Sequence, residues 1–291
     1  MQSVIPRFAA SFTFVILLTF VCASQTTPTP AKSANEWKLV WSDEFNGPDE
    51  APVDPSKWVL ETGGKGWGNE ELEYYTDRAS NVSLHDGKLV IKAVAEKYAS
   101  SDGVRSNYTS GRLKTFGKFS QAYGRFEARI KLPSGQGMWP AFWMLGDDIE
   151  KVGWPACGEI DIMENVGKEP GVIHGSIHGP GYTGNTGIEA PYRLRGKERF
   201  SDDFHVFAVE WDSDSVSFFV DHNLYVRRTR ADLKPGWKWV FDKPFFLILN
   251  LAVGGDWPGN PDASTVFPQS MLVDYVRVYE KAEPPKKIRQ R

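Results

Sequence analysis

Apolar and polar residues alternate along much of the chain between residues 37 and 279. This alternation is typical of β-strands, because successive side chains of a strand point to opposite faces of a sheet. Residues 123–132 alternate without a break. Residues 81–95 form two such runs around Asp86-Gly87, a dipeptide favoured in hairpin turns, and therefore predict a β-hairpin.

The second half of the chain continues this pattern. Residues 204–211 and 215–227 predict a hairpin that turns at Asp221–Asn223, and residues 245–251 and 271–279 are apolar runs rich in β-forming residues. No segment keeps helical spacing over three turns. Many short strands separated by turn residues are typical of an antiparallel sandwich or barrel, so we predict one all-β domain.

Segments of different composition flank the predicted domain, which spans residues 36–281. Residues 1–24 combine a basic start, an uncharged apolar run and small residues at the end, the pattern of a cleaved secretory signal. The alternatives are an uncleaved anchor and a lipoprotein attached through Cys22. Residues 25–35 predict a flexible linker, and residues 282–291 predict a basic disordered tail. We therefore expect a secreted or periplasmic protein without membrane contact once the signal is removed.

Composition narrows the class of function. The 291 residues carry a formal net charge of −3, which argues against the basic surface of a nucleic-acid-binding protein. Aromatic residues make up 13% of the chain, including 11 Trp, and favour a surface on which a ligand stacks. Cys22 and Cys157 are the two cysteines, so signal cleavage leaves no intramolecular disulfide, and we interpret Cys157 as a small packing residue. We expect a monomer.

Three acidic residues lie close together in residues 158–165, which read Gly-Glu-Ile-Asp-Ile-Met-Glu-Asn. On a strand, Glu159 and Asp161 share one face, while the isoleucines point to the opposite face. A regular strand would place Glu164 on that apolar face, where an unpaired carboxylate is costly. A one-residue β-bulge near Met163 would return Glu164 to the face of the other acids, and bulges are frequent beside active sites.

Carboxylates crowded on one face repel each other, so at least one is expected to keep its proton near neutral pH. One protonated and one ionised carboxyl form the pair that acid–base catalysis requires. Two carboxyls about 5–5.5 Å apart hydrolyse a glycosidic bond with retention, through a covalent intermediate. The alternatives are an exposed acidic strand face and a calcium cluster. We favour the hydrolase because the acids alternate with strong β-forming residues.

The segment GEIDIMEN closely resembles the catalytic signature of glycoside hydrolase family 16, in the form of its laminarinase branch, the endo-β-1,3-glucanases. The resemblance implies a β-jelly roll of two curved antiparallel sheets, with a polysaccharide across the concave face. It also implies that Glu159 is the nucleophile, Asp161 the assisting acid and Glu164 the general acid/base. Further matching motifs are WSDEFNG (41–47), WGNEELEYYT (67–76), YGRFEARIKLP (123–133), GMWPAFWML (137–145), GSIHGPGY (175–182), LNLAVGGDWPG (249–259) and VDYVRVYE (273–280).

Several tryptophans are candidate sugar platforms, because the C–H groups of a pyranose ring pack on aromatic faces. Trp139 and Trp143 lie four residues apart and face one side of a strand, and the resemblance places both near the cleavage point. Trp257 lies in a glycine-rich loop, where core packing is harder, and Trp67 is a weaker candidate of the same kind. Core packing is the alternative for each ring.

The resemblance marks four polar residues as substrate-binding: His178, Asn69, Glu71 and Arg112. A structural role is the alternative for each. Glu70 and Glu73 make the 67–73 segment more acidic than the usual family pattern GNNELQ. His174 and His178 share one face of the predicted strand. A zinc site needs a third ligand, so we interpret His174 as structural.

Many members of the family hold a calcium ion away from the substrate. The resemblance implies that Glu44 and Asp274 mark this structural site, and simple ion pairing is the alternative. Calcium prefers oxygen ligands, including carbonyls, so the full ligand set cannot be counted from sequence. No cofactor is expected for the chemistry.

The sequence therefore predicts a secreted, retaining endo-β-1,3-glucanase whose partner is a polysaccharide. The first alternative is a hydrolase or transglycosylase of the same clan that acts on mixed-linkage β-1,3-1,4-glucan or a marine galactan. The net charge of −3 argues weakly against sulfated galactans. The second alternative is a non-catalytic carbohydrate-binding module, which the three crowded acids disfavour.

Overall fold

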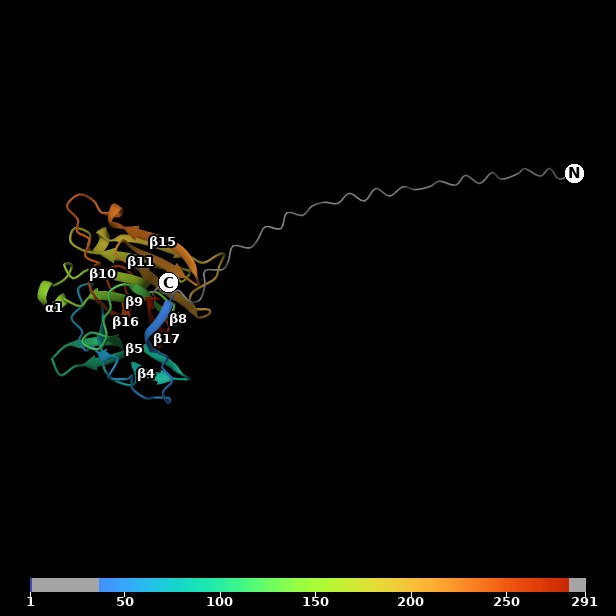
Figure 1. Ribbon diagram of the computed structural model, residues 1–291. Coiled ribbons are helices and arrows are strands. Elements are labelled where there is room, and N and C mark those ends of the chain that lie inside the picture. The colour runs from blue at the N-terminus through green and yellow to red at the C-terminus, as the bar shows by residue number, and fades with distance from the viewer. Residues whose placement is uncertain (2–36, 283–291) are drawn as a thin grey trace. The chain divides into compact units, whose positions relative to one another are not determined.

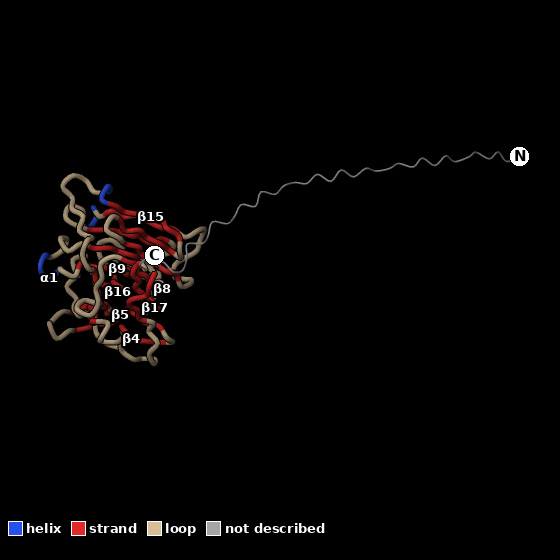
Figure 2. The backbone as a smooth tube through the Cα atoms, in the orientation of Figure 1, coloured by secondary structure: helices blue, strands red, loops and turns tan. Residues whose placement is uncertain are grey.

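The strands form two sheets that pack face to face, so the fold is a sandwich. The computed structural model describes Met1 and residues 37–282, and residues 37–282 fall within one compact unit, Asn35–Arg291. Strands and loops make up nearly all of this unit (Figures 1 and 2), as the all-β prediction requires. The predicted signal, linker and tail lie outside the described residues, apart from Met1 and Ala282. Among the described residues, no helix is long and apolar enough to cross a membrane.

The first sheet has ten strands in the order β15-β14-β13-β8-β17-β5-β6-β3, with β1 paired to β17 and β4 to β5. Its strands are β1 (Trp37–Asp43), β3 (Glu73–Tyr75), β4 (Val82–His85), β5 (Lys88–Ala99), β6 (Arg105–Ser110), β8 (Gly124–Lys131), β13 (His205–Trp211), β14 (Ser215–Val220), β15 (Asn223–Thr229) and β17 (Gln269–Lys281). Apart from the parallel pair β3–β6, its neighbouring strands are antiparallel.

The second sheet has seven antiparallel strands in the order β12-β11-β10-β9-β16-β7-β2. Its strands are β2 (Val59–Leu60), β7 (Arg112–Lys114), β9 (Met138–Gly146), β10 (Glu159–Glu164), β11 (Val172–His178), β12 (Ile188–Arg193) and β16 (Phe245–Val253). The helical segments are α1 (Ile149–Val152) and the 3-10 turns η1 (Gly184–Thr186) and η2 (Arg230–Asp232).

The main core lies between the two sheets. Phe126 and Phe207 of the first sheet and Phe142, Ile160 and Leu249 of the second are fully buried in one apolar cluster. Because side chains alternate along a strand, the residues between these positions on β9, β10 and β16 point to the opposite face of the seven-stranded sheet. We call this opposite face the site face.

A smaller apolar cluster lies on the site face. It contains Cys157, Leu145, Phe246 and Ile248. Cys157 is fully buried, and burial raises the pKa of its thiol to about 11. A thiol of this kind is unreactive, so the interpretation of Cys157 as a packing residue is confirmed.

Both predicted turns are present. Between β4 and β5, Asp86 and Gly87 have φ values of 49° and 66°, the positive values that a type I′ hairpin turn requires. β14 and β15 turn at Asp221, also as predicted. An additional turn precedes them, because the Asp212 carboxylate accepts the N–H group of Ser215 at 2.8 Å. The segment that was predicted as one hairpin is therefore a three-stranded meander, β13–β14–β15.

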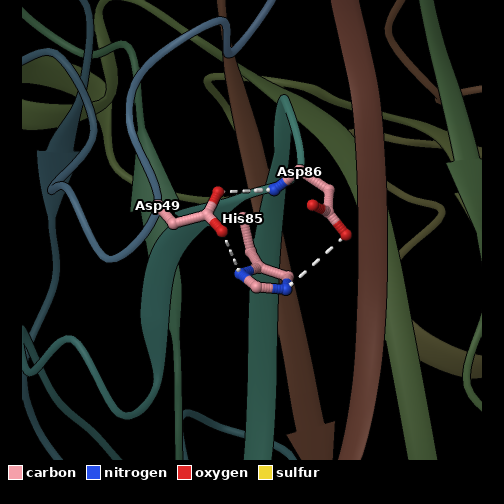
Figure 3. A group of neighbouring side chains, drawn as sticks. All are labelled: Asp49, His85 and Asp86. Carbon is pink, nitrogen blue, oxygen red and sulfur yellow. Dashed lines mark hydrogen bonds and ion pairs between the residues drawn. The ribbon is translucent and has the colours of Figure 1, made fainter.

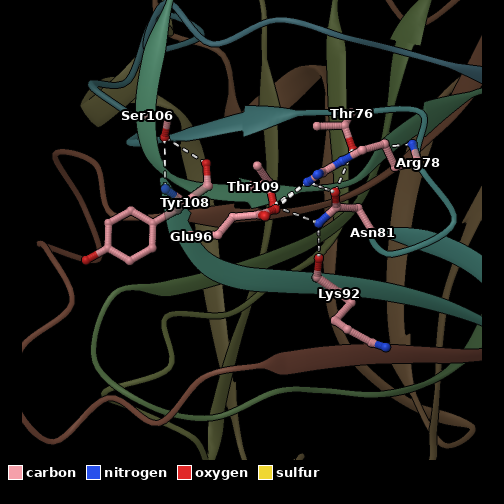
Figure 4. Close-up of polar contacts among 8 residues, drawn as sticks. All are labelled: Thr76, Arg78, Asn81, Lys92, Glu96, Ser106, Tyr108 and Thr109. Atoms are coloured by element: carbon pink, nitrogen blue, oxygen red, sulfur yellow. Dashed lines mark hydrogen bonds and ion pairs between the residues drawn. The ribbon is translucent and has the colours of Figure 1, made fainter. Parts of the chain in front are cut away.

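A buried polar network ties the segment after β3 to β5 and β6 (Figure 4). Asn81 is fully buried and donates to the carbonyl of Lys92 at 3.0 Å and to Thr109 Oγ1 at 3.1 Å. Arg78 donates to Asn81 Oδ1 at 3.0 Å and forms an ion pair with Glu96. Because the polar atoms of Asn81 have partners, the entry to β4 avoids the cost of unpaired buried groups.

Replacing Phe126 by Ala is expected to lower the free energy of unfolding by about 3–5 kcal/mol, because loss of the buried ring leaves a cavity between the sheets. Leu39, which is 48% exposed, provides the control. Leu39→Ala should change stability by less than about 0.5 kcal/mol. Urea unfolding measures both values, and equal losses would contradict the core position of Phe126.

Candidate active site

β10 carries the three predicted catalytic acids, and its register contains the predicted bulge. Opposite β9, Asp161 pairs with Trp143, whereas Met163 pairs with Phe142. Ile162 is therefore the extra residue, and Ile162 and Met163 are both buried. The extra residue returns Glu164 to the site face, so this prediction is confirmed.

The two glutamates accept hydrogen bonds from tryptophans on the site face. The indole N–H of Trp154, in the loop before β10, donates to Glu159. The indole N–H of Trp139 on β9 donates to Glu164 at 3.0 Å. These neutral donors orient the carboxyl groups without adding positive charge.

Asp161 lies between the glutamates and pairs with a histidine. It is 2% exposed, and its Oδ2 lies 3.0 Å from Nε2 of His178 on β11. One carboxylate oxygen each of Glu159 and Asp161 and one ring nitrogen of His178 lie within 4.8 Å of one another. The backbone of Gly187 supports the other side of the imidazole, where an added Cβ would lie 2.2 Å from His178 Cε1. The ring is therefore held between Asp161 and a position that accepts only glycine.

Burial and the negative charges determine the protonation of this cluster. Burial, followed by the charge of Asp161, raises the pKa of Glu159 to about 8, although His178 and Trp154 act in the opposite direction. The same two causes raise the pKa of Glu164 well above its ordinary value. Burial lowers the pKa of His178, but the neighbouring acids outweigh it and raise the value to about 9. At neutral pH the cluster thus keeps a proton on a carboxyl, as the crowding predicts.

An aromatic group lies beside Glu164. The rings of Trp139 and Trp257 meet edge to face, with centroids 5.5 Å apart. His174 of β11 contacts Trp257 at 5.0 Å and pairs with Glu189 through Nδ1. Trp139 and Trp257 are both half-buried on the site face, where they can offer aromatic surface to a ligand. His174 supports Trp257, consistent with the structural role that we expected for it.

A second aromatic group surrounds Arg112. The guanidinium of Arg112 on β7 is 4.7 Å from the Trp67 ring centroid and 4.8 Å from that of Trp143. Arg112 Nε donates to Glu61 at 2.6 Å. The structure therefore places Arg112 between two indoles and against a carboxylate, and its predicted contact with sugar hydroxyls stays a prediction.

The predicted residues of the 67–73 segment make contacts within the protein. Glu71 is 8% exposed and accepts from Asn69 Nδ2 at 3.1 Å and from the Tyr75 hydroxyl at 2.9 Å. Asn69 is exposed. Both carboxylate oxygens of Glu71 are thus engaged by protein donors, and a direct contact with substrate stays untested for both residues.

Sequence reasoning missed Trp154, Glu61 and Asn250 at this site. Asn250 interrupts the apolar run of β16, is 5% exposed and accepts from Trp143 Nε1 at 2.7 Å. A lone amide inside an apolar strand is a signal that could have identified it. Trp154 and Glu61 lie at no periodic position, so only the folded structure reveals their contacts.

The two predicted calcium ligands are engaged in ion pairs. Both oxygens of Glu44 accept from Arg277, at 2.9 and 2.7 Å. Asp274 Oδ2 lies 2.7 Å from Arg129. Arginine pairing neutralises the carboxylates that calcium would need, so these side chains alone do not fit an ion, and the calcium site stays a prediction.

Another group of acidic residues and a histidine lies at the β4–β5 turn (Figure 3). Asp49 Oδ2 is 3.0 Å from His85 Nδ1, and Asp86 Oδ2 is 3.6 Å from His85 Nε2. All three residues are exposed. Because each ring nitrogen already faces a carboxylate, the arrangement is a local ion pair at the hairpin turn.

A β-sandwich that carries crowded carboxyls and tryptophans on one sheet face is an architecture suited to polysaccharide hydrolysis. The family model "Glycosyl hydrolases family 16" matches residues 67–277. The chain is 43% identical to the "Beta-glucanase" of Rhodothermus marinus over 282 residues, which cover 93% of this chain and 95% of the relative. This protein therefore belongs to family 16 of the glycosyl hydrolases.

Solved structures agree with this assignment. The laminarinase catalytic domain from Thermotoga maritima MSB8 superimposes with a TM-score of 0.80 at 49% identity. The match covers 85% of this chain and 100% of that domain. The endo-beta-1,3-glucanase from Pyrococcus furiosus gives a TM-score of 0.81 at 50% identity, covering 85% of this chain and 96% of the other. The predicted family, jelly-roll fold and enzyme class are thus confirmed.

Replacing Glu159 by Gln is expected to stabilise the fold at alkaline pH. A pKa raised from 4.5 to about 8 means that the folded state favours the protonated carboxyl. The stability that the protonated carboxyl contributes to the wild type is fully present below pH 4.5. It is lost as the pH rises through about 8. The variant should therefore gain about 1–3 kcal/mol over the wild type at alkaline pH and much less in acid.

Urea unfolding across the pH range measures this difference. Glu150→Gln provides a control at an exposed glutamate of α1 and should show no pH-dependent gain. A stability difference between Glu159→Gln and the wild type that does not change with pH would contradict the described electrostatics of the cluster.

Proposed function

We propose that this protein is an endo-β-1,3-glucanase that hydrolyses its substrate with retention of configuration. The proposal rests chiefly on the bulge of β10, which gathers Glu159, Asp161 and Glu164 on one face. The similarity to beta-glucanase and laminarinase relatives supports β-1,3-glucan as the substrate.

In the first step, protonated Glu164 donates its proton to the glycosidic oxygen while ionised Glu159 attacks the anomeric carbon. The bond to the leaving sugar breaks, and a covalent α-glycosyl ester forms on Glu159. In the second step, Glu164 as a carboxylate takes a proton from water, which displaces Glu159. The product has the β-configuration, and both acids return to their starting states.

The environment of Glu164 supports its role as the proton donor, because burial and the charge of Asp161 raise its pKa well above the ordinary value. The pKa of Glu159 is also raised, to about 8, so Glu159 must release its proton before it attacks. His178 opposes this rise, and its positive charge favours the ionised nucleophile. Asp161 holds His178 in place through their 3.0 Å ion pair. Asp161 therefore assists the nucleophile by positioning the imidazolium, although its own charge raises the pKa of Glu159.

The tryptophans supply the sugar-binding surface in this proposal. Trp139 and Trp257 lie on the Glu164 side of the acids, and Trp143 lies beside Asp161 in register. Several aromatic rings beside the acids give more than one stacking position for the sugar units of a polymer. The similarity to the endo-beta-1,3-glucanase from Pyrococcus furiosus supports endo action.

A different glucan or galactan substrate is the alternative within the same family. Laminarin, lichenan, agarose and carrageenan can be compared by assay of new reducing ends, and product sizes after short digestion separate endo from exo action. Fast release of long products from laminarin supports the proposal, whereas activity confined to another polymer would replace the substrate. Polysaccharide binding without product would favour the non-catalytic module.

We also propose that the protein is exported and acts as a monomer. The basic start, the apolar run and the small residues of residues 1–24 support export. Sequencing the N-terminus of protein recovered from the culture medium or periplasm, with light scattering of the same sample, tests both statements. An intact residue 1 in that sample would contradict cleavage.

Glu159→Gln and Glu164→Gln are each expected to lower kcat on laminarin at least about a hundredfold, because each removes one participant of the double displacement. Circular dichroism should show an unchanged fold. Glu150→Gln on α1 serves as the exposed control and should retain full activity. Near-normal turnover in either site variant would exclude that residue from the chemistry.

Azide distinguishes the roles of the two acids. With an activated β-glucoside, Glu159→Ala should be rescued by azide to an α-glycosyl azide, because azide attacks directly from the face that the nucleophile has left. Glu164→Ala should instead give a β-glycosyl azide, through the intact covalent intermediate. Proton NMR of the products identifies the anomer, and the opposite pattern would exchange the two assignments.

A further inference from the structure

A chain of hydrogen bonds on the site face holds the indole of Trp143. We call this chain the indole relay, and it consists of Trp143, Asn250, Tyr75 and Glu71. Trp143 Nε1 donates to Asn250 Oδ1 at 2.7 Å, Asn250 Nδ2 donates to the Tyr75 hydroxyl at 3.2 Å, and that hydroxyl donates to Glu71 Oε2 at 2.9 Å. Asn250, Tyr75 and Glu71 are all buried, so bulk water competes little for these bonds.

The chemistry of its two ends fixes the direction of the relay. An indole N–H group can only donate, so the amide oxygen of Asn250 must face Trp143 and its NH₂ group must face Tyr75. The hydroxyl then accepts from the amide and directs its own proton to Glu71. Without this hydroxyl, the Asn250 amide would lose the acceptor that keeps its oxygen toward the indole.

Glu73 supports the far end of the relay. It is 1% exposed, and its Oε2 accepts the N–H of Val253 at 2.6 Å. Burial, followed by the charge of Glu71, raises the pKa of Glu73 well above its ordinary value. Glu73 therefore keeps its proton and adds no charge beside Glu71, the acceptor for Tyr75.

The relay fixes the edge orientation of the Trp143 ring, which the contact with Arg112 leaves undetermined. Arg112 lies over the ring, 4.8 Å from its centroid, and restrains its face. A contact with the face alone does not determine which edge points to β16. The bond from Nε1 to Asn250 determines this edge, so the face and the edge are held by different groups.

We propose that Tyr75 and Asn250 are positioning residues that hold the indole of Trp143 as the sugar platform, with Glu71 keeping the relay in its direction. The inference rests on the proposed function, because it takes a β-glucan as the ligand. It replaces the direct sugar contact predicted for Glu71 by an action through Tyr75.

The carboxyl pair also makes this platform sensitive to alkaline pH. The charges of Glu71, Glu73 and Arg112 on β7 all act on Tyr75. Arg112, the cation among them, is already neutralised by Glu61. Loss of the Glu73 proton would therefore place a second negative charge beside Glu71 without a free counterion, and we expect weaker glucan binding.

A double-mutant cycle tests the positioning role. Binding of a β-1,3-linked glucohexaose is measured by calorimetry in a Glu159→Gln background, which prevents turnover. Tyr75→Phe should weaken binding about tenfold, but less than about twofold when Trp143→Phe is already present, because its effect passes through that ring. A purely structural role would weaken binding equally in both backgrounds, and this outcome or an unchanged affinity would overturn the proposal.

Tyr279→Phe provides the matched control. Its hydroxyl also donates to a glutamate, Glu127 on β8 at 3.3 Å, but neither residue contacts the indole relay. This variant should bind the glucohexaose as the parent does. If Tyr75→Phe fails to fold, Asn250→Ala replaces it in the same cycle, with the same expected non-additivity.

Glu73→Gln tests the role of the Glu73 proton. The amide oxygen can still accept from Val253 and the neutral amide adds no charge beside Glu71, so binding at about pH 6 should stay within about twofold of the parent. At alkaline pH the parent should lose affinity while Glu73→Gln retains it. A tenfold loss for Glu73→Gln at acidic pH, or the same alkaline loss in both proteins, would refute this part of the proposal.

Assays of the wild-type enzyme separate failure of this inference from failure of the proposed function. If no β-glucan yields new reducing ends, the proposed function fails whatever the binding cycle gives. If laminarin is cleaved but Tyr75→Phe acts independently of Trp143, only the positioning role of the relay is lost.

Discussion

One extra residue in β10 determines where the third acid of this enzyme lies. Ile162 has no partner opposite it on β9, so the alternation of faces is reset between Asp161 and Glu164. With regular pairing, the carboxyl of Glu164 would project between the sheets, against rings such as Phe142, where an unpaired charge is costly. The bulge therefore has two effects. The sandwich core stays apolar, and the site gains its third acid.

The donors around the acids explain why the site keeps protons. Indole N–H groups of Trp154 and Trp139 bind the two glutamates, and a lysine or arginine in their place would stabilise the ionised carboxylates. His178 is the one cation that the described residues place directly on the acid cluster, and it pairs with Asp161. The indoles thus orient the glutamates, whereas His178 supplies the positive charge. This division allows two chemically similar glutamates to differ in protonation.

Local pattern predicted much of the fold and the core of the site, because both depend on short-range alternation. The bulge followed from the cost of burying Glu164, and the hairpin turn from Asp86-Gly87. Contacts between distant segments could not be predicted in this way. Glu71 was expected to face sugar, but Tyr75 and Asn69 occupy its oxygens, and Arg112 lies between indoles 45 and 31 positions away in sequence, Trp67 and Trp143. Such partners are determined by how strands pack, which spacing alone does not encode.

The contact between Gly187 and the imidazole of His178 links a surface loop to the chemistry. Even a methyl group at position 187 would overlap the ring that shares charge with Asp161. Gly187 is the one residue between η1 and β12, and it cannot gain a side chain without displacing the imidazole. A loop grafted between β11 and β12 must therefore keep a glycine at position 187, although this residue contributes no functional group.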